Sequence, residues 1–305
     1  MQTCPICNKN DQTRLFLKLD GQRRARLKAF DVKYYGGGLR SIFTEDQFRI
    51  SECKKCDHIF YDQTITNAQL SEMYELHTRS KKKPQSHPPH PSQSITRDRI
   101  SDFIKSLTKN YDNLPMRILD FGSGTGLWAE ICADLGHEVY AFEPHPSRSN
   151  ASSKYSRISE WTSICKIKFD FIICNQVLEH LLTPAESLRR IRRVCHKDSI
   201  LYTSVPNARL KSINQTKETW PFDFKKNHIL APFQHLHGFS QKSFLRLHRE
   251  TSFRPKIDFY SSFTLRGART IVGLTLGRLF PQLASTSYLF SPIAVEQEHP
   301  GIFDG

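Results

Sequence analysis

A glycine-rich turn between two short apolar runs is the feature that most constrains the fold of this chain. The turn, residues 122–126 (GSGTG), follows an apolar run that closes on Asp120. Apolar residues then recur every four positions and predict a helix, at Leu127, Ile131 and Leu135. A second apolar run, residues 139–142, ends on Glu143. The order predicts a strand, a glycine turn, a helix and a second strand that ends on a carboxylate.

This order of elements predicts a binding site for a nucleoside. Glycines allow the backbone to turn sharply off a strand and to approach a ligand closely. A carboxylate at the end of the next strand can accept hydrogen bonds from both hydroxyls of a ribose, as in dinucleotide-binding folds. The dinucleotide pattern has two residues before its last glycine, whereas Gly122, Gly124 and Gly126 alternate here. The spacing therefore differs from the dinucleotide pattern.

The run from Asp120 to Gly126 (DFGSGTG) resembles the first motif of class I S-adenosylmethionine-dependent methyltransferases. The run 169–181 (FDFIICNQVLEHL) resembles the fourth strand and following loop of the same family, and its apolar part is typical of a strand buried on both faces. The resemblance implies an α/β fold with a Rossmann-like, doubly wound, seven-stranded methyltransferase sheet. It implies S-adenosylmethionine as cofactor, bound by Asp120, Gly122, Ser123, Gly124, Gly126, Glu143, Asn175 and Gln176.

Four of the eight cysteines form two C-x-x-C pairs, Cys4 with Cys7 and Cys53 with Cys56. Two such pairs can hold one tetrahedral ion and predict a closed structural Zn²⁺ site in a small zinc-ribbon-like domain. A redox-active C-x-x-C is the alternative. Two pairs, neither within a strand–helix pattern, favour zinc. The remaining cysteines are expected to be small buried hydrophobic residues: Cys132, Cys165, Cys174 and Cys195.

The chain is expected to divide into successive regions. They are a zinc-ribbon-like domain (1–79), a linker rich in Pro, His and Lys (80–94), the methyltransferase domain (95–296) with a substrate-loop insertion (207–239), and a tail (297–305). Loops are expected at residues 21–28 and 36–38. Helices are expected at 66–74, 99–107, 147–156, 241–249 and 265–280, and strands at 199–205, 253–260 and 288–295.

One further helix has a clear predicted start. Thr183 is the expected N-cap, Pro184 the first helical residue, and Glu186 the partner in a capping box. Its buried face is expected to hold Leu188, Ile191 and Cys195. The basic helix at residues 265–280 could lie on a membrane surface or contact another subunit, and packing on its own domain is the favoured interpretation.

The net charge of +14 favours anionic partners, such as nucleic acid, nucleotide-linked sugars or phospholipid surfaces. Diffuse surface charge without a target is the alternative. The sequence contains no run of 18 apolar residues, so no transmembrane helix is predicted. The first ten residues also lack an apolar signal segment. A cytoplasmic location is therefore expected.

His180 and His235 are the candidate catalytic residues. Methyl transfer from a sulfonium is an in-line displacement that needs alignment and, for an acceptor bearing a proton, a base. Histidine can act as a base near neutral pH. His180 lies in the loop after the expected fourth strand, and His235 precedes the F-S start of the helix at 241–249. Roles in orienting the loop or in structural hydrogen bonding are the alternatives.

The two C-x-x-C pairs (the cysteine knuckles), combined with the methyltransferase domain, resemble bacterial methyltransferases that act on nucleotide-linked sugars or surface-polysaccharide precursors. The resemblance implies a small, sugar-containing, anionic acceptor. Sugar C-methyltransferases of this kind carry a further large C-terminal domain, whereas this chain ends about 45 residues after the expected sixth strand, which leaves O-methylation open. The alternatives are an RNA methyltransferase and a non-catalytic binding module that retains the fold.

Overall fold

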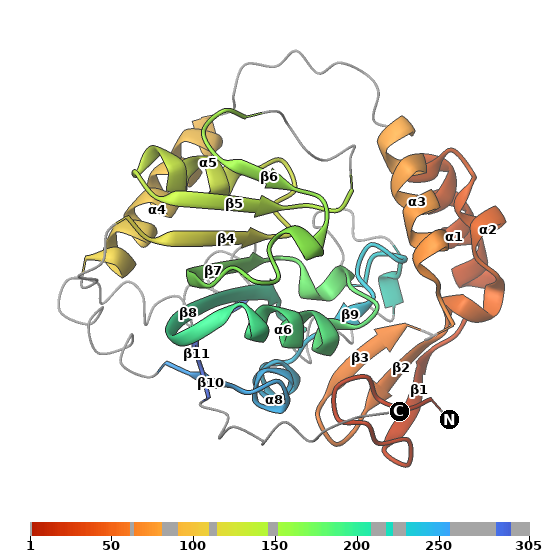
Figure 1. Cartoon of the computed structure of the whole chain (residues 1–305). Coiled ribbons are helices and arrows are strands. Elements are labelled where there is room, and N and C mark those ends of the chain that lie inside the picture. Colours follow the sequence, from red (N-terminus) through yellow and green to blue (C-terminus); the bar gives the residue numbers. More distant parts are fainter. Residues whose placement is uncertain are drawn as a thin grey trace, which may run out of the picture.

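The computed structural model describes residues 2–61, 64–80, 91–109, 115–145, 152–208, 218–221, 230–256 and 285–293 (Figure 1). These residues form one seven-stranded sheet and one four-stranded sheet. Among the helices in these ranges, none is both long and apolar enough to cross a membrane. The expected helix at 265–280 and the expected tail lie outside the described residues.

The seven-stranded sheet has the strand order β10-β11-β8-β7-β4-β5-β6. Its strands are β4 Arg117–Phe121, β5 Glu138–Phe142, β6 Ser156–Ile158, β7 Phe169–Asn175, β8 Cys195–Pro206, β10 Phe253–Pro255 and β11 Ser285–Pro292. The pairs β4–β5, β4–β7, β5–β6 and β7–β8 are parallel, whereas β11 is antiparallel to both β8 and β10. The strand order reverses between β4 and β7, and open α/β sheets bind ligands outside the carboxyl ends of their strands at such a point.

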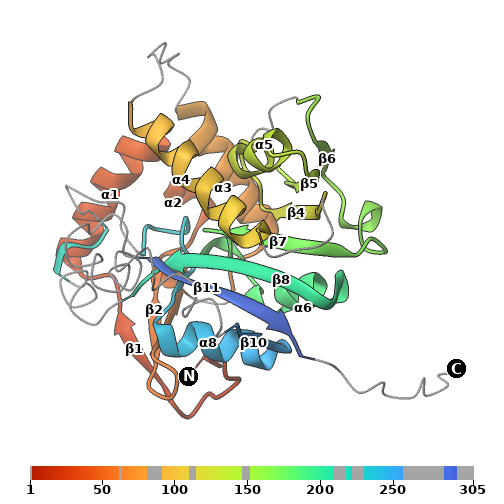
Figure 2. The same cartoon turned by 90° about the vertical axis from the view of Figure 1, so that its left-hand side faces the viewer.

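Helices cover both faces of this sheet, as Figures 1 and 2 show. Successive side chains of a strand point to opposite faces. In β4, Ile118 therefore joins the core under α4 (Pro91–Thr108) and α5 (Leu127–Asp134), whereas Leu119 joins the core with α6 (Pro184–Arg193) and α8 (Gln241–Glu250). A strand buried on both faces requires an almost continuous apolar sequence, which explains the FDFIIC run of β7. The expected Rossmann-like α/β fold is thus confirmed.

The N-terminal region forms the second sheet, in the order β1-β2-β3-β9. Its strands are β1 Thr13–Leu17, β2 Ile50–Cys53, β3 His58–Tyr61 and β9 His237–Gly238, accompanied by helices α1 Gly21–Tyr35, α2 Leu39–Ile42, α3 Asn67–Ser80 and the 3₁₀ turn Glu45–Phe48. Strand β9 belongs to the expected insertion and pairs with β3. Insertion residues also complete the hydrophobic core of the N-terminal helices, namely Ala208, Trp220, Leu230, Phe233 and Leu236. In Figure 1 this region lies beside the carboxyl ends of β4 and β5.

The loop expected at residues 21–28 is instead the first half of helix α1, so that expectation was wrong. Asp20 caps this helix by accepting a hydrogen bond from the Arg23 N–H, and Gly36 ends it in the left-handed conformation. Leu27 and Phe30 are buried in the N-terminal core. Because the first turns of α1 are rich in basic residues, its narrow apolar face gives no clear helical pattern in the sequence.

Three local expectations about the methyltransferase region were also wrong. Thr183 precedes α6, but its hydroxyl contacts the Glu186 carboxylate at 3.3 Å and caps no backbone N–H, so the capping box is absent. Cys195 is buried in β8 and does not lie on the helix. The expected helix at 147–156 is absent from its described part, because residues 152–155 are irregular and Ser156 begins β6.

Two other boundaries differ from the expected ones. Helix α4 begins at Pro91, so the last four residues of the expected linker are helical. The described part of the expected sixth strand is β10, which is only three residues long. The last described residues form β11, which lies between β8 and β10, so β10 is the edge strand of the sheet.

Candidate functional site

The turn after β4 has a backbone that its three glycines make possible. Gly122, Gly124 and Gly126 have φ angles of +74°, +54° and +85°. A Cβ atom on Gly122 would lie 2.6 Å from Val177 Cγ2, closer than real Cβ contacts. A Cβ atom on Gly124 would meet nothing within 4 Å, so the space in front of this residue is open. The turn is thus closely packed on the side of β7 and open at its middle glycine.

Glu143 lies at the end of β5 and contacts this turn directly. The Gly124 N–H donates to Glu143 Oε2 at 3.0 Å, and the His145 N–H donates to Oε1 at 3.0 Å. The N–H groups of Gly122 and Ser123 donate to the Phe142 carbonyl at 2.8 and 3.0 Å. A carboxylate offers about four lone-pair sites, so Glu143 retains acceptor capacity for a ligand.

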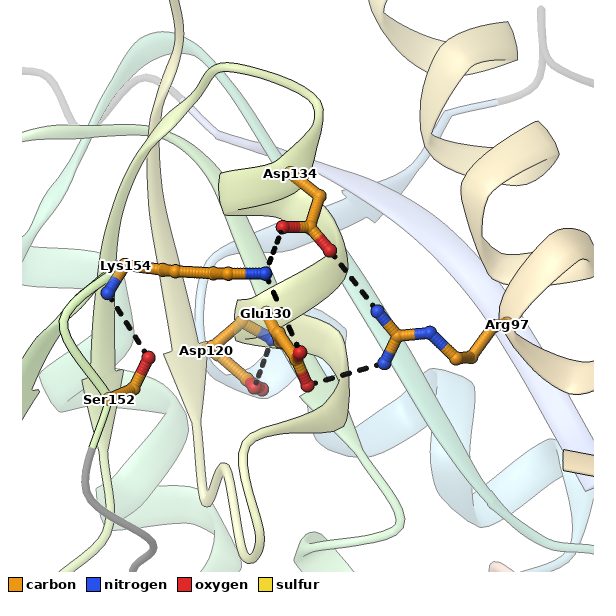
Figure 3. Close-up of polar contacts among 7 residues, drawn as sticks. Arg97, Asp120, Glu130, Asp134, Ser152 and Lys154 are labelled. Atoms are coloured by element: carbon orange, nitrogen blue, oxygen red, sulfur yellow. Dashed lines mark hydrogen bonds and ion pairs between the residues drawn. The ribbon is translucent and has the colours of Figure 1, made fainter. Parts of the chain in front are cut away.

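Asp120 lies beneath the turn rather than on its open side. Its side chain is buried, and Oδ2 accepts a hydrogen bond from the Ala129 N–H of α5 at 3.1 Å (Figure 3). Burial raises the pKa of the Asp120 carboxyl to about 7, partly offset by this hydrogen bond and increased by the charge of Glu143. The Asp120 carboxyl thus holds the start of α5 in place. That Asp120 also binds the cofactor remains a prediction.

Charged side chains hold α5 from outside (Figure 3). Arg97 of α4 contacts Glu130 Oε2 at 3.2 Å and Asp134 Oδ2 at 3.1 Å. Lys154 contacts the second oxygen of Asp134 at 2.6 Å. These half-exposed pairs connect α4, α5 and the segment before β6, and so fix the helix that follows the glycine turn.

The loop after β7 lies against the same turn. Asn175 is the last residue of β7 and is half-buried. Gln176 adopts a φ of +56°, its N–H donates to the Ser204 carbonyl at 2.8 Å, and its side-chain amide donates to Ser204 Oγ at 3.0 Å. Val177 then packs over Gly122. The two loops that the sequence assigned to the cofactor are therefore in contact, although the individual roles of Asn175 and Gln176 remain predictions.

Glu179, His180 and His235 form a cluster beyond this loop. Their potential ligand atoms all lie within 4.8 Å of one another. Glu179 and His180 lie in the 3₁₀ turn Leu178–His180, and the rings of His180 and His235 meet edge to face at a centroid distance of 4.7 Å. The structure thus brings together two histidines that the sequence singled out separately.

Glu179 is the member of the cluster that the sequence did not identify as a candidate catalytic residue. It is 0% exposed, and within the described ranges neither carboxylate oxygen has a hydrogen-bond partner. Burial raises the pKa of this carboxyl to about 8. Charged residues in loops are normally solvated, so sequence reasoning had no reason to expect this burial. The only available signal was the position of Glu179 directly before His180.

The end of the insertion is attached to this loop. The Leu236 N–H donates to the Glu179 carbonyl at 2.7 Å, and His237 Nε2 donates to the Leu181 carbonyl at 2.8 Å. His237 Nδ1 therefore accepts from His58 Nε2, at 3.0 Å. Burial lowers the pKa of His237 to about 4 and that of His58 well below its ordinary value, so both imidazoles are neutral. This chain of hydrogen bonds joins β3, β9 and the loop after β7.

The four knuckle cysteines meet in one buried cluster. Cys4 Sγ lies 3.6 Å from Cys56 Sγ, and Cys7 Sγ lies 3.5 Å from Cys53 Sγ. All four sulfur atoms lie within 4.8 Å of one another, and none is in a disulfide. Tetrahedral Zn–S bonds of about 2.3 Å would place the sulfurs about 3.8 Å apart, so the donor set fits this ion. The cluster packs in the same core as α8, and Ser240 Oγ donates to the Cys56 carbonyl at 3.3 Å.

Comparisons with known proteins agree with this fold. A curated relative, a ubiquinone biosynthesis O-methyltransferase from Methylocella silvestris, is 31% identical over 108 residues, which cover 32% of this chain. The chain matches only 42% of the length of that relative. A solved structure of the plantazolicin methyltransferase BamL, in complex with a desmethyl-plantazolicin analogue and S-adenosylhomocysteine, has a TM-score of 0.50 at 14% identity. The superposition covers 73% of this chain and 91% of that protein and shows the shared fold.

A family model described as a methyltransferase domain matches residues 92–255, which is more than half of the chain. The match includes the glycine turn, Glu143, the loop after β7 and the end of the insertion. The chain therefore belongs to the methyltransferase-domain family.

Proposed function

We propose that this chain transfers the methyl group of S-adenosylmethionine to a small, sugar-containing, anionic acceptor such as a nucleotide-linked sugar or a surface-polysaccharide precursor. The observation that carries the proposal is the hydrogen bond between Gly124 and Glu143 beside the point where the strand order reverses. Parallel sheets bind nucleotides at this point, and a carboxylate there can accept ribose hydroxyls.

The chemistry of this edge fits the cofactor. The open space at Gly124 would admit its amino-acid end next to the backbone of the turn, together with Gly122, Ser123 and Gly126. Glu143 would bind the ribose with the acceptor sites that its two backbone hydrogen bonds leave, and Asn175 and Gln176 would line the methionine side. Bound in this way, the cofactor supplies a methyl group on an electrophilic sulfonium sulfur.

The protein's own part in the reaction is alignment and proton removal. His180 and His235 are the residues proposed to act on the acceptor, and both are only half-buried. The insertion that carries His235 would form the acceptor side of the site, since long loops at this sheet edge commonly set specificity. The net charge of +14 supports an anionic acceptor.

We further propose a structural zinc ion in the cluster of Cys4, Cys7, Cys53 and Cys56. Four thiolates fill its coordination, so the ion would hold β2 and the N-terminus in place and take no part in methyl transfer. Thiolate ligands persist in a reducing compartment, so the cytoplasm is the proposed location.

The test combines cofactor binding with acceptor identification. Calorimetry should detect S-adenosylmethionine binding to the full chain. Glu143→Gln should weaken this binding roughly 10- to 100-fold, since a hydrogen bond to a charged group contributes about 1.5–3 kcal/mol. Glu138→Gln is the matched control, because Glu138 lies at the opposite end of the same strand and contacts Arg117 instead. A chain that binds no cofactor would be a non-catalytic module.

The acceptor is identified by a screen with labelled S-adenosylmethionine. The fractions are nucleotide-linked sugars, lipid-linked sugars and total RNA, and the label is expected in a sugar fraction. Transfer to RNA alone would replace the proposed acceptor with nucleic acid. In that case the binding of the labelled RNA should weaken steeply with added salt.

A further inference from the structure

The buried carboxylate of Glu179 receives no hydrogen bond from the described residues, and the nearest nitrogen printed against it is His180 Nε2 at 3.9 Å. Its side chain is 1% exposed, and both oxygens lack a hydrogen-bond partner within the described ranges. Removing a carboxylate from water without a partner is costly, so buried carboxylates are paired, bind a metal ion or take up a proton. The Glu179 carboxylate is therefore expected to bind a cation or to carry a proton.

Two imidazoles converge on this carboxylate. His180 Nδ1 contacts the Gln234 carbonyl, which can only accept, so Nδ1 carries the hydrogen. The lone pair of this ring then lies on Nε2, the nitrogen 3.9 Å from Glu179 Oε1. Metal-binding histidines usually donate the N–H of the nitrogen that does not bind the metal to a backbone carbonyl or a carboxylate, as Nδ1 of His180 does here. His235 completes the group, with its ring against that of His180.

We propose that Glu179, His180 and His235 bind one divalent transition-metal ion, and that this ion also binds the acceptor hydroxyl to be methylated. One carboxylate and two imidazoles are a ligand set for Zn²⁺, Fe²⁺ and related ions, and three protein ligands leave coordination positions open. The inference rests on the proposed function, because it assigns the open positions to the acceptor of the methyl group.

The dimensions of the cluster suit such an ion. Bonds of about 2.0–2.2 Å from a metal to nitrogen and oxygen place neighbouring ligand atoms roughly 3 to 4 Å apart. The three potential ligand atoms lie within 4.8 Å of one another, so a contraction of about 1 to 2 Å at most closes the site. The Leu236 N–H, bound to the Glu179 carbonyl at 2.7 Å, already fixes the backbone on which two of the ligands are carried.

The ion would change the role of the two histidines from bases to ligands. A hydroxyl that binds a divalent cation has a lowered pKa and loses its proton to solvent water near neutral pH. The acceptor oxygen then forms a bond to the methyl carbon as the carbon–sulfur bond breaks, and the electron pair of that bond stays on sulfur. The products are a methyl ether, a neutral thioether and a proton in solution, so no further reactant is required.

Manganese is the probe for the test, since Mn²⁺ favours oxygen and nitrogen ligands over the thiolates of the knuckle cluster. The full chain is dialysed against a weak chelator, and Mn²⁺ binding is measured by electron paramagnetic resonance. One site is expected. Glu179→Gln and His235→Asn should each weaken it at least tenfold. The matched control is His196→Asn, because His196 also contacts a carboxylate, Asp170 at 3.0 Å, but at the opposite end of β7.

Calorimetry with S-adenosylmethionine on the same variants separates the possible outcomes. Cofactor affinity within about threefold of the unmodified chain shows that the fold is intact in Glu179→Gln and His235→Asn. Absence of Mn²⁺ binding, or binding that these variants leave unchanged, overturns the inference and indicates that a proton neutralises Glu179. If the cofactor binds and Mn²⁺ does not, only the metal site fails. If the cofactor itself does not bind, the proposed function fails.

Discussion

Replacing Gly122 with alanine tests the close packing between the turn after β4 and the loop after β7. The added Cβ atom would lie 2.6 Å from Val177 Cγ2 and 2.9 Å from Cγ1. Valine is β-branched and stiff at χ1, and Val177 is 8% exposed, so these methyl groups cannot turn away easily. The substitution should therefore strain both the backbone and the packing.

The size of each contribution follows from a matched control. Gly136 has a φ of +87°, close to the +74° of Gly122, but a Cβ atom there meets nothing within 4 Å. Gly136→Ala should cost about 1–2 kcal/mol for the left-handed backbone alone. Gly122→Ala should cost this amount plus about 1–3 kcal/mol for overpacking. The difference between the two variants isolates the contact with Val177.

The assay is urea unfolding of both variants, followed by a double-mutant cycle with Val177→Ala. Removing the two clashing methyl groups should restore part of the loss, so the coupling free energy should be about 1–3 kcal/mol. Equal destabilisation of the two glycine variants would refute the reasoning. Additivity within about 0.5 kcal/mol in the cycle would also refute it, because the contact between the loops would then be too weak to matter.

The remaining predictions concern buried and partly exposed charges and the cysteine cluster. The pKa of Asp120 is raised from 3.8 to about 7, so the folded state retains a proton that the unfolded state releases. Stability should fall by up to about 4 kcal/mol as pH rises from 4 to 7, and urea unfolding of Asp120→Asn should lack this loss. Cys53→Ser should abolish zinc in elemental analysis and lower Tm, whereas the buried control Cys132→Ser should retain the metal. Arg97→Ala should cost about 0.5–1 kcal/mol at low salt and less at 1 M NaCl, and an unchanged cost would contradict a screened ion pair.

The part of the site that is local in sequence could be predicted. Strand β4, the glycine turn, α5 and β5 follow one another without interruption, so the pattern that ends on Glu143 needs no distant contact. The carboxyl ends of adjacent parallel strands share one edge of the sheet, which is why the loop after β7 could be expected beside this turn. The parallel sheet itself follows from the continuous apolar run of β7.

The rest depends on contacts between distant segments. Helix α1 was mistaken for a loop because its apolar face, with Leu27 and Phe30, is narrow and is stabilised by packing in the N-terminal core. The burial of Glu179 was not predictable, because its contacts with His235 and Leu236 come from the distant insertion. His180 and His235 were each proposed, but nothing local to either one indicates that their rings meet.

The pairing of β3 with β9 also determines when the N-terminal region can mature during translation. His58 and His237 are separated by 179 positions, so the ribosome must synthesise almost the whole methyltransferase core before their contact can form. At about 5–20 residues per second, this delay is roughly ten to forty seconds. During that interval the edge of β3 lacks its partner strand, and the Tyr61 hydroxyl, which later donates to the Leu230 carbonyl, lacks its acceptor. The N-terminal region therefore leaves the ribosome before the methyltransferase core but is completed after most of it.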